Sequence, residues 1–93
     1  MAFKTVNVTL SGNTQVTSTR IPVKQVLIFN VTGNAEVLVG DSNLSATVYG
    51  FAVAAGTVGP SIGPFSGEAP LNLSEIYLRG TDTQVVRVTY ITH

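Results

Sequence analysis

The chain has 93 residues, only 11% of them charged, and its five basic and five acidic side chains give a formal net charge of zero. This length allows one domain, residues 1–93, and the absence of cysteine excludes disulfides and thiolate metal sites. Scattered cations balanced by acids argue against nucleic acid as a partner, because phosphate binding takes several Lys or Arg. A membrane span is also disfavoured, since no apolar run approaches the roughly 20 residues that it needs. We expect no secretory signal, because the first residues lack an apolar segment.

Strand patterns fill the first forty residues, and no segment repeats with the period of a helix. Val6, Val8 and Leu10 alternate with polar residues, which predicts a strand with one buried face. The apolar run at 26–29 predicts a central strand covered on both faces, and a Gly-containing turn at 32–34 predicts a hairpin. The strands expected here are 4–10, 15–18, 25–31 and 35–39, the last two forming the hairpin.

The second half continues the strand pattern around one irregular stretch. One short strand is expected within 44–53, and the Gly- and Pro-rich residues 54–70 predict a long irregular connection. Strands at 75–79 and 84–92, joined by a turn at 80–83, predict a second hairpin. Six to eight short antiparallel strands indicate an all-β fold, either a β-sandwich or a jelly-roll-like barrel.

No combination of residues in the sequence indicates an active site. The only histidine, His93, is the last residue, and a frayed end does not hold a general base in place. Asp41 and Asp82 stand in turns, where Asp caps backbone donors. A calcium ion shared by these turns is a minor alternative, because hard cations require more oxygen ligands. We therefore expect no catalytic residue, no cofactor and no metal, and predict that the chain is not an enzyme.

Apolar side chains near one end and on the irregular connection are the candidate protein-contact residues. An exposed apolar group is costly unless something covers it, and a neutral surface loses few ion hydration shells when a partner covers it. The composition therefore favours a protein that functions in contact with other proteins. The alternative is an ordinary β-domain that has a neutral, Thr-rich surface. Phe29 is expected in the core. The contact candidates are Phe3, Val58, Ile62 and Phe65.

Several motifs in the C-terminal two thirds resemble a known family. They are Glu36-Val37-Leu38-Val39-Gly40-Asp41-Ser42, Gly50-Phe51, Ala54-Ala55-Gly56, Leu73-Ser74-Glu75-Ile76-Tyr77-Leu78-Arg79-Gly80 and the stretch 85–90. In layout and turns they are similar to the small β-sandwich virion proteins of tailed bacteriophages, which include capsid decoration (cement) proteins. The resemblance implies a homotrimer on the capsid surface of the virion that binds the major capsid protein and stabilises capsomer contacts, with no substrate or cofactor. The Gly- and Pro-rich residues 57–70 depart from this pattern.

A second hypothesis is an accessory module of a phage tail or fibre that binds a receptor or a glycan. Such a module needs an aromatic platform on which a sugar ring stacks. Its candidates are Tyr49, Tyr77 and Tyr90, although tyrosine bodies more often pack in a core with the hydroxyl at the surface.

Overall fold

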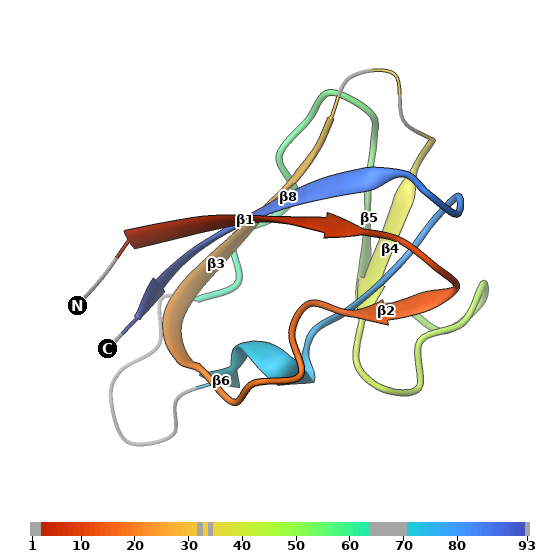
Figure 1. Cartoon of the computed structure of the whole chain (residues 1–93). Coiled ribbons are helices and arrows are strands. Elements are labelled where there is room, and N and C mark those ends of the chain that lie inside the picture. Colours follow the sequence, from red (N-terminus) through yellow and green to blue (C-terminus); the bar gives the residue numbers. More distant parts are fainter. Residues whose placement is uncertain (1–2, 32, 34, 64–70, 93) are drawn as a thin grey trace.

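The computed structural model describes residues 3–31, 33, 35–63 and 71–92, which form two four-stranded antiparallel sheets packed on each other (Figure 1). Sheet A has the strand order β1-β8-β3-β6, and sheet B has the order β2-β7-β4-β5. The chain is therefore an all-β sandwich, as the strand patterns predict. Its elements are β1 (Phe3–Thr9), β2 (Asn13–Gln15), β3 (Pro22–Asn30), β4 (Val37–Gly40), β5 (Phe51–Val53), β6 (Leu71–Asn72), the 3-10 turn η1 (Leu73–Glu75), β7 (Tyr77–Arg79) and β8 (Val85–Thr92).

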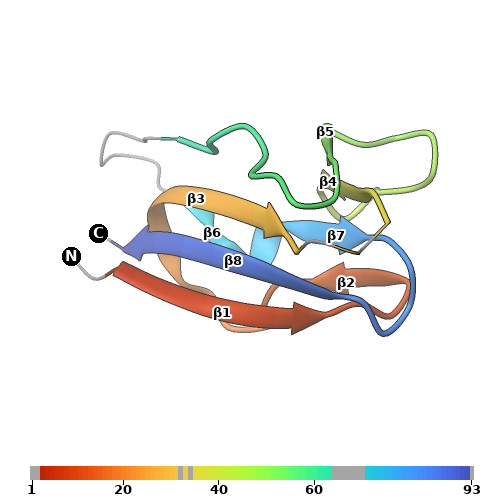
Figure 2. The same ribbon diagram turned by 90° about the horizontal axis from the view of Figure 1, so that it is seen from above.

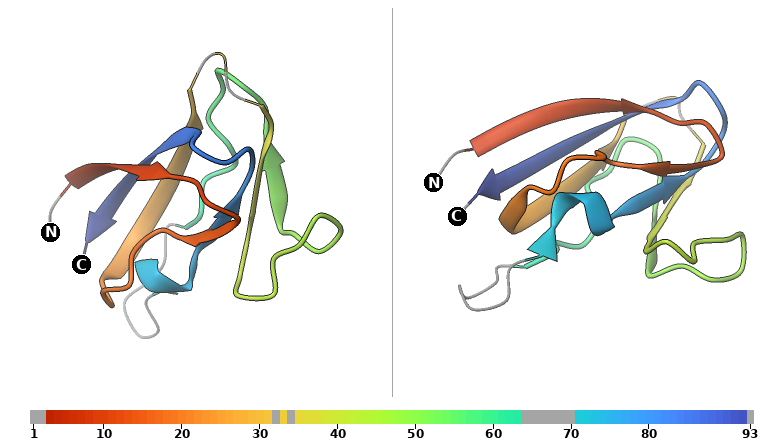
Figure 3. Two further views of the ribbon diagram at one scale, coloured as in Figure 1. Left: turned by 45° about the vertical axis from the view of Figure 1, so that its right-hand side comes forward. Right: turned by 60° about the horizontal axis from the view of Figure 1, so that its bottom comes forward.

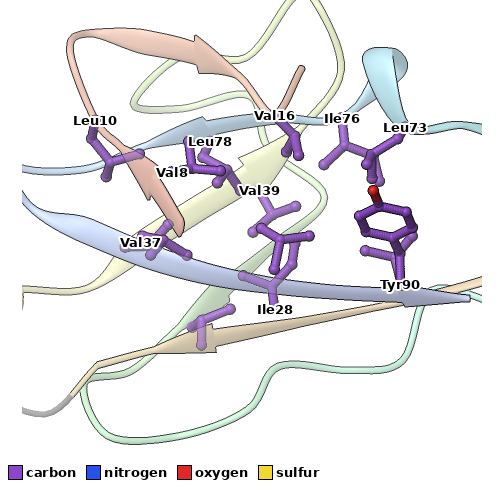
Figure 4. Packing of buried hydrophobic residues seen from close by; sticks show 14 of the residues in the cluster. Val8, Leu10, Val16, Ile28, Val37, Val39, Leu73, Ile76, Leu78 and Tyr90 are labelled. Carbon is purple, nitrogen blue, oxygen red and sulfur yellow. The ribbon is translucent and has the colours of Figure 1, made fainter. Parts of the chain in front are cut away.

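The core lies between the two sheets and takes its buried residues from β1, β3, β4, β5, β7 and β8 and from the segments beside them (Figure 4). In β8, the side chains of Val86, Val88 and Tyr90 are buried, and the residues between them face outward. The alternation that predicts the first strand is confirmed, because Val8 and Leu10 are buried. Strand alternation thus decides which residues of β1 and β8 face the core, whereas in β3 a register shift between Val23 and Gln25 interrupts it.

Most connections in this sandwich cross from one sheet to the other. Among the described strands, β4 and β5 are the only consecutive pair that forms a hairpin, across the connection 41–50. The hairpins predicted over 25–39 and 75–92 are wrong, because β3 and β4 belong to different sheets, as do β7 and β8. A turn between two sheets uses the same residue types as a hairpin turn, so the local sequence does not separate the two.

Two side-chain amides hold these crossings in place. Asn30 is fully buried, and its Nδ2 donates to the carbonyl oxygens of Ala35 and Val53, each at 2.9 Å. The Gln84 side chain pairs with the backbone of Ala35: Nε2 donates to the carbonyl oxygen and Oε1 accepts from the N–H, both at 3.0 Å. The segments before β4 and before β8 are therefore fastened by side chains in place of a hairpin ladder.

The irregular connection after β5 runs along the outer edge of β3 (Figure 2). Val26 and Ile62 exchange backbone hydrogen bonds of 2.8 and 2.9 Å, and the Gly59 N–H donates to the carbonyl oxygen of Ile28 at 2.9 Å. The described part of this connection is irregular as predicted, and it satisfies backbone groups that an open sheet edge would expose to solvent.

Candidate functional site

Alternate residues of β1, β8 and β3 point away from the core and form what we call the outer face of sheet A. The register places Phe3 opposite Ile91, and it places Asn7, Arg87 and Phe29 in one row across the three strands. No described segment passes over these strands in Figure 2. The residues of the outer face on these strands are Phe3, Thr5, Asn7, Thr9, Gln25, Leu27, Phe29, Val85, Arg87, Thr89 and Ile91.

At its paired positions the outer face combines exposed apolar side chains with one formal charge, that of Arg87. Phe3 is 73% exposed and Val85 is 37% exposed, whereas Leu27 and Phe29 are half-buried. The guanidinium carbon of Arg87 lies 5.7 Å from the centre of the Phe29 ring. This cation–π contact favours an Arg87 side chain that lies along the sheet. The surface is therefore apolar and neutral-polar, with one cation near its middle.

The structure brings two of the predicted contact residues to this face and separates a third from it. Val58 is the bridge partner of Phe29, and opposed residues share a face, so Val58 extends the outer face beyond β3. It is 55% exposed. Ile62 instead pairs with Val26, whose side chain is in the core, and Ile62 packs half-buried against that core. Phe65 lies outside the described residues.

The sequence patterns do not reveal every residue of this surface, and they place one of them in the core. Phe29 was predicted in the core, but it faces outward, because the inward positions of β3 are those of Val26 and Ile28. The prediction that 26–29 is covered on both faces is wrong for the same reason. Leu27 and Ile91 were missed. The signal that would find them is the alternation of each strand taken together with the pairing of β3 and β8.

Two shallow depressions at the end of β4 share Asp41 and are lined by the tyrosines of the second hypothesis. One contains Tyr49, which is 48% exposed, and the other contains Tyr77 and Glu75. Their volumes, about 290 and 270 Å³, lie at the lower limit of small-molecule pockets. Tyr90 takes no part in a surface platform, because it is buried between the sheets (Figure 4). The connection 41–50, which carries Tyr49, extends away from the sandwich in both views of Figure 3.

The alternative of a calcium ion shared by Asp41 and Asp82 is wrong, because the turns that contain them lie at opposite ends of sheet B. Gly40, next to Asp41, pairs with Tyr77, whereas Asp82 follows the far end of β7 beyond Arg79. Each carboxylate caps a backbone donor: Asp41 Oδ1 accepts from the Asn43 N–H and Asp82 Oδ1 from the Gly12 N–H, both at 2.9 Å. In the described part of the chain, no three His, Cys, Asp or Glu side chains cluster as metal ligands.

Comparisons with protein-family models, with curated proteins and with solved structures found no match. The described residues also contain no helix that is long and apolar enough to cross a bilayer. The fold and the outer face define a small β-sandwich with an apolar sheet surface that carries one charge. Any assignment of function rests on the chemistry of that surface and of the two depressions.

Proposed function

We propose that this chain is a non-enzymatic virion protein that decorates the outside of a tailed-phage head and stabilises contacts between capsomers. The observation that carries the proposal is the outer face of sheet A, where Phe3, Val58 and Val85 are exposed beside a single cation. The motif resemblance described above supplies the class of partner, the major capsid protein. The low charge of the whole chain supports the same role.

Covering this face favours binding because apolar area leaves water while few ions lose their hydration. Each Å² of apolar surface that a partner covers contributes about 25 cal/mol. Arg87 sets the one electrostatic requirement, since a guanidinium that is buried without a counter-charge is costly. We therefore expect a carboxylate on the capsid opposite Arg87. Such a contact, repeated over many subunits of a shell, slows the separation of neighbouring capsomers.

The test measures binding of the purified chain to heads of the phage that encodes it, prepared without the decoration protein. The double variant Val58→Glu and Val85→Glu places two charges on exposed positions of the outer face. We expect it to bind at least ten-fold more weakly than the original chain, whereas Ser18→Glu, on the exposed connection before β3, leaves binding unchanged. Equal binding by both variants would show that the capsid contact lies elsewhere on the protein. If the original chain did not bind the heads, the proposal would be wrong.

The depressions beside Asp41 support a second candidate, a glycan- or receptor-binding module of a tail or fibre. An exposed tyrosine next to carboxylates offers both a stacking surface and hydrogen-bond acceptors for a sugar. Glu75 is already engaged, because its Oε2 accepts a 2.8 Å hydrogen bond from the Asn72 N–H. A glycan array distinguishes the candidates: a hit that Tyr49→Ala abolishes favours this module, and an array without hits removes it.

A further inference from the structure

Sheet A ends in a long strand whose far side has no partner among the described residues. β1 pairs with β8 over all seven of its residues and is the outermost ribbon of sheet A in Figure 2. The other sheet edges are short or covered. β2 and β5 have three residues each and β6 has two, and the connection after β5 covers the edge of β3. β1 is thus the one long open edge of the described sandwich.

The hydrogen bonds of Leu10 establish which backbone groups of β1 face the open side. The Leu10 N–H donates to the carbonyl oxygen of Gln84 at 2.8 Å, and its own carbonyl oxygen accepts from the Thr83 N–H at 2.9 Å. Because this orientation alternates along an antiparallel pair, the even-numbered residues of β1 direct their backbone groups to β8. The odd-numbered residues direct theirs away from β8. These residues are Phe3, Thr5, Asn7 and Thr9.

β1 lacks most of the features that keep an open edge from pairing. Proteins commonly protect such strands with proline, a bulge or charged side chains. β1 contains no proline, its register with β8 is continuous, and its single charge is Lys4, near its start. The side chain of Val6 is only half-buried, although its face of the strand is the core face. The edge therefore presents both free backbone groups and an incompletely covered valine.

We propose that β1 pairs antiparallel with β1 of a second copy of this chain, across a two-fold axis at Val6. In this register Thr5 lies opposite Asn7 of the other copy, and Phe3 lies opposite Thr9. The residues with outward backbone groups are thereby hydrogen-bonded to each other, and the two Val6 side chains meet as a close, non-hydrogen-bonded pair. The two A sheets become one continuous sheet, and Val6 is covered by its own counterpart.

The strand favours its own copy over a strand of another protein because its pattern is self-complementary. The two-fold register pairs Thr5 with Asn7 on the outer side, and on the inner side it places the two Val6 residues together and each Lys4 opposite Val8. The two Lys4 charges lie at opposite ends of the pair, so no like charges oppose each other. This inference does not depend on the phage proposal, and it gives a dimer where the motif resemblance implies a homotrimer.

Sedimentation equilibrium over a range of protein concentrations tests the pairing. The chain is expected to approach twice its monomer mass of 9.7 kDa. Val6→Lys places two cations directly opposite each other, and we expect it to raise the dissociation constant at least ten-fold. Val85→Lys, on the central strand of the same sheet, is the matched control and leaves the dimer intact. A monomer at all concentrations, a trimer, or a dimer unaffected by Val6→Lys would overturn the inference.

Disulfide trapping tests the register with a milder substitution. The chain has no cysteine, so Val6→Cys introduces a single thiol. In the proposed pair the two residues at position 6 are close enough for a disulfide. Those at position 7 are offset by two residues along the strands, about 6.8 Å, which together with the spacing between the strands puts their Cα atoms about 8 Å apart, beyond the roughly 7 Å that a disulfide spans. We expect mild oxidation to cross-link Val6→Cys and to leave Asn7→Cys monomeric on a non-reducing gel. Equal cross-linking of both variants, or none at position 6, would contradict the register.

Discussion

Asn30 is a polar residue in the otherwise apolar interior of the described sandwich. Its amide donates to two carbonyl oxygens that belong to separate segments of the chain, those of Ala35 and Val53. Ala35 accepts a further side-chain hydrogen bond from Gln84, and Val53 also stands in the β4–β5 ladder, opposite Val37. A buried carbonyl oxygen without a donor costs about 1 to 3 kcal/mol. Asn30 therefore joins the end of β3 both to the segment before β4 and to β5.

We predict that Asn30→Ala lowers the free energy of unfolding by about 2 to 3 kcal/mol, since it removes both donors and leaves a small cavity. Urea unfolding measures the loss as a lower midpoint with an unchanged slope. Asn7→Ala, on the exposed outer face, is the control and is expected to change stability by less than about 0.5 kcal/mol. A change in Asn30→Ala no larger than in this control would mean that the amide bonds contribute little.

The structural roles of Asn30 and Gln84 could not be predicted from the sequence, and the reason is physical. The groups that each amide binds lie up to 23 and 49 residues away along the chain. A hydrogen bond to a distant backbone carbonyl leaves no periodic trace in the sequence. By contrast, the burial of Val8 and Leu10 follows from strand alternation, which is local and therefore predictable.

At the scale of elements, the connection after β5 acts as an edge cover without being a regular strand. Gly59 lies where this segment passes close to the side chains of β5. A β-carbon at this position would lie 2.7 Å from Cγ2 of Val53 and 3.0 Å from Cε2 of Phe51, both closer than side-chain carbons normally approach. Glycine is therefore needed here for close approach, and a larger residue would push the segment away from β3.

We predict that Gly59→Val destabilises the protein by about 1 to 3 kcal/mol, because overpacking displaces this segment. Hydrogen exchange followed by NMR gives the specific signature. The N–H groups of Val26 and Asn30, which donate to this segment, are expected to exchange faster, while those between β1 and β8 stay protected. Ala55→Val, at an exposed position of the same connection, is the control. Unchanged exchange at both N–H groups in Gly59→Val would show that the segment tolerates the side chain.

Strand positions could be predicted to within a few residues, but strand partners could not. The strand expected at 15–18 is found as β2 at Asn13–Gln15, and it pairs with β7 across more than 60 residues. β6 was not predicted, because a strand of only two residues is too short to show an alternation of apolar and polar side chains. The irregular character of the stretch after β5 is confirmed over its described part, yet its edge-covering role depends on backbone hydrogen bonds, which any residue except proline can donate.

At the scale of the whole molecule, the candidate surface is a product of sheet register. Phe3 and Val58 were predicted as contact residues because each is apolar in a position that is poorly covered. Their presence on one face follows from the pairing of β1, β8, β3 and the connection after β5, which brings together segments from both ends of the chain. The type of a residue and its neighbours in the sequence suggest whether it is exposed. Which exposed residues share one surface depends instead on pairing between distant strands.

The pairing of β1 with β8 also decides how the sandwich responds to mechanical force. Phe3 and Ile91 are direct partners, so the outer ends of the two strands lie together (Figure 1). A pulling force applied at residues 3 and 92 opens the β1–β8 ladder by unzipping, so that its hydrogen bonds bear the load one after another. A pull at residues 3 and 85 loads the whole ladder in shear. We expect single-molecule force spectroscopy to show a lower rupture force for the first geometry, and equal forces would place the mechanical weak point elsewhere.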